Sequence, residues 1–309
     1  MSSKLRVIGA EELRARLPMV AAVDALEEAF GTLDPGNEPL RTHVETPAGT
    51  LLLMPTFGEA GVGVKLVSLT PANPERGLPF IHASYVLFDA MTQVPDTVLD
   101  GSALTALRTA AVSGLATRFL SREDAHRLVI FGAGVQGRSH LEAMCAVRDV
   151  TDLVVVSRSP GPGEALVEEG LGRGLTARRG EPDAVGEADL VCTCTTAETP
   201  LFEGSLLPEG VHVNAVGSYR PETREVDTET VRRARVVVET REVAIAEAGD
   251  LLLPIEETVI GPEHIVADLA ETVRGAAVRR SPEDVTLFKS VGLAFEDLVI
   301  ARAVVDAAR

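Results

Sequence analysis

A glycine-rich turn between a buried-looking strand and a helix constrains this chain more than any other feature. The run Leu128-Val-Ile-Phe-Gly132-Ala-Gly134-Val-Gln-Gly137 has the spacing GxGxxG. The first glycine allows a tight turn, the second lets backbone N–H groups approach a pyrophosphate, and the third lets the helix pack closely on the strand. In this context the spacing predicts a dinucleotide-binding turn made of Gly132, Ala133, Gly134, Val135, Gln136 and Gly137, and the alternative is a turn with a structural role only.

Short strand-like runs alternate with helical segments after this turn. The runs begin at Leu128, Leu153, Leu190, Val211 and Arg235. Such alternation predicts an α/β fold, with a Rossmann-type doubly wound parallel sheet over residues 119–291. We interpret residues 173–180 as a solvated loop or helix end and residues 241–280 as helical and loop-like. The residues from 285 onward are interpreted as a loop followed by a long helix.

The chain before residue 119 follows a different pattern. Apolar residues recur at helical spacing over residues 10–33 and again over 104–120. Between these segments, residues 41–99 contain short runs rich in Val, Leu and Thr, which Pro and Gly turns separate. This order predicts a second domain of α+β type, with an antiparallel sheet.

Charge and composition exclude several kinds of partner. The 46 Asp and Glu residues outnumber the 29 Lys and Arg residues, giving a formal net charge of -17, so the surface repels nucleic-acid phosphates and anionic membranes. No stretch approaches the roughly 18 apolar residues of a membrane span. The three cysteines imply no disulfide framework, and Cys192 and Cys194 have no further zinc ligands close in sequence. We therefore expect a cytoplasmic protein without a metal site.

The end of the second strand of the Rossmann domain indicates which cofactor is bound. An NAD-selective site usually has an acidic residue here, which accepts from the ribose 2′-hydroxyl. This chain has Ser157, Arg158 and Ser159 instead. A guanidinium matches phosphate geometry, so we predict NADP(H) as the preferred cofactor and NAD(H) as a possible one. The alternative is that Arg158 is an ordinary surface arginine.

Six ordered motifs extend over nearly the whole chain. They are Leu53-Met-Pro55, Gly63-Val-Lys65-Leu-Val, Leu104-Thr-Ala-Leu-Arg108-Thr-Ala-Ala, the glycine-rich turn, Asn214-Ala-Val-Gly217 and Thr286-Leu-Phe-Lys-Ser-Val-Gly292. Together they resemble the ornithine cyclodeaminase and mu-crystallin family. The resemblance implies a homodimer in which residues 1–118 and 292–309 form a domain for substrate binding and dimerisation, with substrate in the cleft between the two domains.

The same resemblance implies that Arg41, Lys65 and Arg108 bind the carboxylate of an amino-acid-like substrate. The residue types agree with this role for Lys65 and Arg108, because both lie among apolar residues, where burying a cation without a partner charge is costly. Arg41 lies in a Pro-rich segment and could equally be a surface residue. From the resemblance alone, Thr109, Val216, Ser290 and Gly292 lie at the cofactor. Asp297 also matches a family position, although an ion pair within the domain explains it equally well.

Two departures from the family pattern separate the possible reactions. Ornithine cyclodeaminases have an aspartate shortly after the Val-Gly motif and an acidic residue just before Leu-Met-Pro, where this chain has Tyr219 and Leu52. Cyclisation needs a base near the attacking amine, and neither residue supplies one. The chain is more similar to the mu-crystallin branch, whose members reduce cyclic ketimines with NADPH and have a histidine like His82. A hydrogen-bonded structural histidine is the competing interpretation of His82.

The resulting hypothesis is reduction of 1-pyrroline-2-carboxylate or 1-piperideine-2-carboxylate to the cyclic amino acid, with Lys65 or His82 as candidate proton donors beside Arg108. Three alternatives stay open at this point. They are an ornithine cyclodeaminase with bound NAD, an amino-acid dehydrogenase acting on an open-chain imine, and a binding protein that holds NADPH or a small ligand without turnover.

Overall fold

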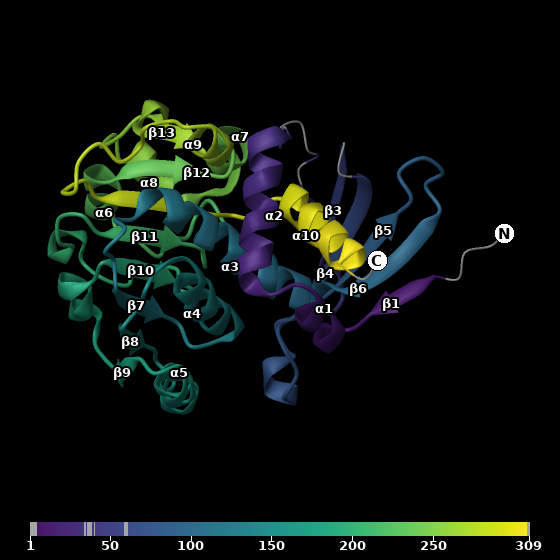
Figure 1. Ribbon diagram of the computed structural model, residues 1–309, viewed down its shortest axis with the longest axis horizontal. Coiled ribbons are helices and arrows are strands. Elements are labelled where there is room, and N and C mark those ends of the chain that lie inside the picture. The colour runs from purple at the N-terminus through teal and green to yellow at the C-terminus, as the bar shows by residue number, and fades with distance from the viewer. Residues whose placement is uncertain (1–4, 34, 36–38, 40, 59–60, 308–309) are drawn as a thin grey trace. The chain divides into compact units, whose positions relative to one another are not determined.

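The computed structural model describes residues 5–33, 35, 39, 41–58 and 61–307, which form two units. Unit 1 comprises the chain up to Arg108 and from Leu293 onward, and unit 2 runs from Thr109 to Gly292. Each unit has its own sheet (Figure 1). The chain therefore leaves unit 1 once and returns to it with its last helix.

The sheet of unit 1 has six strands in the order β1-β6-β5-β4-β3-β2. Neighbouring strands from β2 to β6 are antiparallel, as predicted for residues 41–99, while β1 is parallel to β6. The elements of this unit are β1 (Arg6–Ile8), α1 (Ala10–Arg16), α2 (Met19–Thr32), β2 (Thr42–Thr46), β3 (Gly49–Gly58), β4 (Gly61–Leu69), β5 (Ile81–Phe88), β6 (Pro95–Asp100) and α10 (Ala294–Asp306).

One face of this sheet packs against the returning helix α10. Along β4 every second residue from Gly61 to Leu69 is buried, because successive side chains of a strand point to opposite faces. Leu52 and Met54 of β3 share a core cluster with Ala294 of α10. Helix α10 also contacts α2, where the rings of Phe30 and Phe295 meet edge to face with centroids 5.3 Å apart. The C-terminal helix thus completes the core of unit 1.

The sheet of unit 2 has eight strands, all parallel, in the order β13-β12-β14-β11-β10-β7-β8-β9. Its strands are β7 (Arg127–Phe131), β8 (Asp152–Val156), β9 (Thr176–Arg179), β10 (Leu190–Thr193), β11 (His212–Ala215), β12 (Arg235–Val238), β13 (Ile265–Asp268) and β14 (Thr286–Lys289). Its helices are α4 (Val135–Val147), α5 (Pro160–Gly172), α6 (Thr228–Arg233), α7 (Arg241–Glu247), α8 (Gly249–Glu256) and α9 (Leu269–Val273).

The strand order reverses at β7. The chain runs outward from β7 through β8 to β9, and then crosses back to place β10 on the other side of β7. Parallel sheets of this kind bind ligands beyond the carboxyl ends of their strands at such a reversal point. The glycine-rich turn follows β7 directly, so it lies where the topology predicts a ligand site.

The predicted Rossmann-type sheet is confirmed, but three of its strands are absent from the sequence-based prediction. Residues 173–180 contain β9 rather than only a solvated loop, and 241–280 contain β13. The segment expected to be a loop after residue 285 contains β14, which lies between β11 and β12. Strand β9 contains two arginines, and β13 and β14 each end in a charged residue, so none of them has the apolar run that predicts a buried strand such as β10.

Helix α3 (Gly101–Leu120) spans the division between the units, which falls after Arg108. We predicted this boundary at the end of the helix, after residue 118. The C-terminal half of α3 belongs to unit 2 because it contacts that unit's core: Thr117 Oγ1 accepts a 2.9 Å hydrogen bond from Asn214 Nδ2 of β11. The second boundary, before Leu293, lies one residue from the predicted one.

Candidate active site

Lys65 is a buried lysine in the middle of β4, with 1% of its surface exposed. Its position on the strand points it to the face that packs against α10, where its Nζ lies 2.7 Å from Asp297 Oδ2. Burying an ammonium group is costly unless an opposite charge compensates it. The first turn of α10 supplies that charge, at a helix end where carboxylates are favoured.

Arg108 reaches the same turn of α10 from α3. Its Nε donates to Asp297 Oδ1 at 3.1 Å, and its Nη1 donates to Glu296 Oε2 at 2.8 Å. Arg108 is 6% exposed and both carboxylates are fully buried. Side chains 188 and 189 residues apart in sequence therefore form one ionic network within unit 1.

Three charged side chains act on the pKa of Lys65. The pKa of Lys65 is lowered from 10.5 to about 8, mainly because the side chain is buried and also because of the positive charges of Arg108 and Arg41, whereas Asp297 opposes this shift. We call Arg41, Lys65 and Arg108 the cation cluster. The structure brings together these three residues, which the sequence predicted to bind a carboxylate.

His82 does not belong to the cation cluster. In the antiparallel pairing of β4 with β5, Lys65 lies opposite Tyr85, and His82 lies opposite Ser68. Because side chains alternate along a strand, His82 is on the face of the sheet opposite to Lys65. The prediction that His82 acts beside Lys65 and Arg108 is therefore not met within one chain.

The glycine-rich turn of unit 2 has the geometry that a dinucleotide requires. Gly132 has φ +95°, and a Cβ there would lie 2.5 Å from the carbonyl oxygen of Cys194. A Cβ on Gly137 would lie 1.9 Å from the carbonyl oxygen of Gly132, so α4 can approach the turn only with glycine at this position. Gly134, the N-cap of α4, has no atom within 4 Å of where its Cβ would stand. This open space in front of the helix N-terminus fits a pyrophosphate.

The carboxyl end of β8 carries the predicted determinants of the ribose contact. Arg158 and Ser159 are exposed, and Ser157 Oγ donates to the carbonyl of Ser159 at 3.1 Å. A second arginine, Arg179 at the end of β9, donates from Nη2 to the carbonyl of Ser157 at 3.0 Å. Within the described part of the chain neither arginine forms an ion pair. Arg179 was missed because its segment was interpreted as solvated loop.

Buried charged groups hold the loops at the carboxyl ends of the central strands. Glu225 accepts from Gly217 N at 2.6 Å and Thr195 N at 2.7 Å. Burial raises the pKa of Glu225, and the nearby charge of Asp250 raises it further. Asp250 in turn lies 2.8 Å from Lys289 Nζ at the end of β14. These contacts fix the loops that follow β10 and β11, including the predicted cofactor residue Val216.

Glu239 follows β12 and holds the predicted cofactor segment Ser290–Gly292. Its carboxylate accepts from Ser290 Oγ at 2.6 Å, from Val291 N at 2.9 Å and from Gly292 N at 2.9 and 3.0 Å. Glu239 is 1% exposed. No spacing in the sequence indicated this contact, because the two segments are about fifty residues apart.

The two positions where cyclodeaminases have carboxylates hold other groups here. Leu52 is a buried member of the core cluster beneath α10. Tyr219 packs partly against the core of unit 2, with the Arg220 guanidinium 5.8 Å from its ring centroid. Thr109, the first residue of unit 2, is buried on α3.

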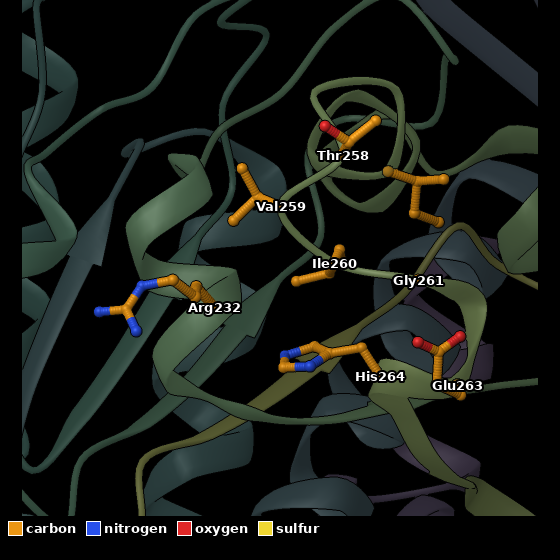
Figure 2. Close-up of a pocket in the computed structure, with 8 residues that line it drawn as sticks. Arg232, Thr258, Val259, Ile260, Gly261, Glu263 and His264 are labelled. Carbon is orange, nitrogen blue, oxygen red and sulfur yellow. The ribbon is translucent and has the colours of Figure 1, made fainter.

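Unit 2 also has a surface pocket away from the glycine-rich turn. The pocket is lined by Arg232, Ile255, Thr258, Val259, Ile260, Gly261, Glu263 and His264 (Figure 2). Arg232 precedes β12 and the residues 258–264 precede β13, so this pocket lies at the amino ends of those strands. The glycine-rich turn lies at the opposite edge of the sheet. We therefore assign the pocket no part in cofactor binding.

Within the described ranges, no helix is long and apolar enough to cross a membrane. Among the same residues, no group of three or more His, Cys, Asp or Glu side chains is placed to hold a metal ion.

Comparison with known proteins agrees with the predicted family resemblance. The model of the "Ornithine cyclodeaminase/mu-crystallin family" matches residues 5–309. The chain belongs to this family. Its relatives include the Δ(1)-pyrroline-2-carboxylate reductase of Bacillus cereus, 38% identical over 96% of this chain and 94% of the relative. The alanine dehydrogenase of Archaeoglobus fulgidus is 30% identical over 97% of this chain and 94% of its own length.

Solved structures of the family share the fold closely. The Thermococcus litoralis Δ(1)-pyrroline-2-carboxylate reductase in complex with NADH and L-proline has a TM-score of 0.93 and 37% identity, covering 98% of this chain and 97% of that one. An archaeal alanine dehydrogenase dimer with bound NAD has a TM-score of 0.92 and 30% identity, covering 98% and 96%. The family and the Rossmann-type fold are therefore confirmed.

Proposed function

We propose that this protein is a reductase of cyclic ketimine carboxylates, converting 1-pyrroline-2-carboxylate or 1-piperideine-2-carboxylate to the cyclic amino acid with a nicotinamide cofactor. The observation that carries the proposal is the cation cluster. Two buried cations and a half-buried one lie together in an acidic protein, an arrangement suited to a small anion. The relatives named pyrroline-2-carboxylate reductases support the same substrate class.

Arg108, Lys65 and Arg41 would bind the substrate carboxylate and so fix the position of the imine carbon. Arg108 donates from Nε and Nη1 to α10, and these two contacts hold its guanidinium in one orientation. Lys65, with a pKa of about 8, can also donate a proton near neutral pH. It is the better candidate for proton donor than His82, which lies on the other face of the sheet.

The glycine-rich turn would hold the cofactor pyrophosphate through its backbone N–H groups and the N-terminus of α4. Its residues are Gly132, Ala133, Gly134, Val135, Gln136 and Gly137. When bound, NAD(P)H supplies the hydride that reduces the imine carbon. Ser290 and Gly292 would lie near the nicotinamide, and Thr109 would reach a phosphate of the cofactor. Val216 is proposed as a further cofactor contact. We propose a preference for NADP(H) over NAD(H), because Ser157, Arg158 and Ser159 stand where a 2′-phosphate would lie and Arg158 has no ion pair among the described residues.

The protein lacks the carboxylates that a cyclodeaminase needs. Tyr219 and Leu52 occupy those positions, and Leu52 faces the same side of the sheet as Lys65, since Met54 pairs with Lys65. Removing a proton from the attacking amine of a cyclisation would require a base, which neither side chain provides. Reduction of a preformed imine requires none.

We also propose a homodimer formed through the sheet of unit 1. On the face opposite Lys65, cross-strand pairs place Val7, Val98, Val86 and Val64 in one row across β1, β6, β5 and β4. Val7 is 69% exposed, and Phe57 on the same face is 66% exposed. An apolar row that is exposed at Val7 and half-buried at Val64, Val86 and Val98 favours burial against another protein surface, and the alanine dehydrogenase relative is a dimer. A cytoplasmic location fits the three free cysteines.

The test is oxidation of NADPH and of NADH, followed near 340 nm, with each of the two imine carboxylates, beside ornithine with NAD+. We expect reduction of at least one imine, faster with NADPH, and no ammonia from ornithine. Ammonia release from ornithine with no imine reduction would overturn the reductase assignment. Faster oxidation of NADH than of NADPH would remove the cofactor preference but leave the reductase.

A further inference from the structure

Asp297 is the one described residue whose carboxylate contacts both Lys65 and Arg108. We propose that Asp297 is a positioning residue of the reductase site: it keeps Lys65 charged beside Arg108, so that both cations bind one substrate carboxylate. This proposal rests on the reductase function proposed above.

The geometry of the contact is that of a bridge. Asp297 Oδ2 lies 2.7 Å from Lys65 Nζ, and Oδ1 lies 3.1 Å from Arg108 Nε. One carboxylate oxygen therefore contacts Lys65 on β4, and the other contacts Arg108 on α3. Because Asp297 is fully buried at the start of α10, it has little freedom to move with either cation. It therefore sets the distance between the two.

Without Asp297 the two cations would destabilise each other. Like charges in a buried site disfavour the charged form, and Arg108 and Arg41 both act on Lys65 in this direction. On the strands beside Lys65 the paired residues are Met54 of β3 and Tyr85 of β5, neither of which is a negative charge at neutral pH. Glu296, on the same turn of α10, contacts Arg108 and forms no ion pair with Lys65. Asp297 is therefore the counter-ion of Lys65.

Glu296 offers a matched control. Glu296 and Asp297 are adjacent, fully buried and both paired with Arg108, but only Asp297 also contacts Lys65. Replacing each by its amide removes one negative charge with little change in shape. A difference between the two variants then reports on Lys65.

The experiment is the pH profile of kcat/KM for the imine in wild type, Asp297→Asn and Glu296→Gln, with thermal unfolding of each. Loss of Asp297 lowers the pKa of Lys65, so the alkaline limb of the profile should move to lower pH by about one unit in Asp297→Asn, with a KM raised about tenfold. Glu296→Gln should raise KM and leave the limb in place. Asp297→Glu keeps the charge but displaces it, so we expect a raised KM with the limb near its wild-type position.

Each result decides the proposal. The proposal is contradicted if the alkaline limb of the pH profile does not move in Asp297→Asn, or if it moves equally in both amide variants. This holds even if both variants are less stable than wild type. If Asp297→Asn does not fold, a wild-type KM in Asp297→Glu contradicts the proposal and a raised KM with an unmoved limb supports it. If the wild-type protein reduces neither imine, the reductase function itself fails, which is a separate outcome.

Discussion

In the proposed function, the cation cluster of unit 1 and the glycine-rich turn of unit 2 would recognise anions by different means. In unit 1, three side chains carry the positive charge, and buried carboxylates on α10 hold two of them in place. In unit 2, backbone N–H groups at the start of α4 would bind the pyrophosphate, and the glycines leave room for it. Charge is therefore concentrated in the first site and almost absent from the second.

The difference shows which kind of change each site tolerates. As proposed, substrate binding in unit 1 would depend on the identity of a few buried side chains, and removing one cation would also leave carboxylates without their partners. As proposed, cofactor binding in unit 2 would depend on the path of the backbone, so we expect that adding atoms there is more damaging than removing charge. The following substitutions test this contrast, beginning with the largest expected effect.

Arg108→Ala should have the largest effect. The substitution removes the cation that two buried carboxylates share, and we expect kcat/KM for the imine to fall about a thousandfold. Affinity for NADPH, measured by quenching of its fluorescence, should stay within about twofold of wild type. Arg108→Lys keeps the charge but cannot reach both carboxylates in the same way, so its loss should be smaller. If Arg108→Ala lost imine reduction and NADPH affinity to the same extent, the claim that the two sites bind their ligands independently would be wrong.

Gly134→Ala and Gly137→Ala form a matched pair in the turn. Alanine at 134 meets no atom of the protein within 4 Å, so the fold should keep its thermal stability while NADPH affinity falls about a hundredfold. Alanine at 137 lies 1.9 Å from the carbonyl oxygen of Gly132, so this variant should lose about 3 kcal/mol of unfolding free energy as well. Calorimetry of the unliganded proteins and cofactor titration separate the two outcomes. Normal NADPH binding by Gly134→Ala would show that the open space is not the pyrophosphate site.

Arg158→Ala tests the one place where charge is predicted to matter in unit 2. We expect the ratio of kcat/KM with NADPH to that with NADH to fall about tenfold, because a single charge-assisted contact is lost. The kcat/KM measured with NADH should change little. Arg179→Ala is the control for a nearby arginine, which is already bonded to the carbonyl of Ser157. An unchanged ratio in Arg158→Ala together with a lowered one in Arg179→Ala would move the phosphate contact to Arg179.

Glu239→Gln should have the smallest effect. An amide has one acceptor oxygen in place of two, so that oxygen can accept from the backbone N–H groups of Val291 and Gly292 only if the Ser290 hydroxyl turns to accept from the amide NH2 instead of donating, and the charge of the acceptor is lost. We expect a loss of about 2 kcal/mol of unfolding free energy and a several-fold higher KM for NADPH, with little change in KM for the imine. A raised KM for the imine alone would contradict a role of Ser290–Gly292 in cofactor binding.

Features that depend on local spacing were predictable from the sequence. The GxGxxG run, the alternation of strands and helices around it and the antiparallel strands before it all have short-range signatures. Lys65 and Arg108 were identified through motifs and through the cost of burying an unpaired charge. Arg41 was identified through the resemblance alone.

Features that depend on pairing between distant segments were not predictable. Nothing near Arg108 indicates Glu296, and nothing near β12 indicates that Glu239 accepts from Ser290, because the fold alone brings them together. Strand β14 is a central strand with four residues, and its neighbours β11 and β12 supply the hydrogen bonds that define it. The face of the sheet to which His82 points follows from its register with β4, which the sequence of β5 alone does not specify.

The most direct measurement compares 1-pyrroline-2-carboxylate with 1-pyrroline, the same imine without its carboxylate, as substrates of wild type and Arg108→Ala with NADPH. If the cation cluster binds the substrate carboxylate, wild type should prefer the carboxylate by about a thousandfold in kcat/KM, and Arg108→Ala should lose most of that preference. A wild-type enzyme that reduces both imines equally well, or a preference that survives in Arg108→Ala, would show that the carboxylate is bound elsewhere.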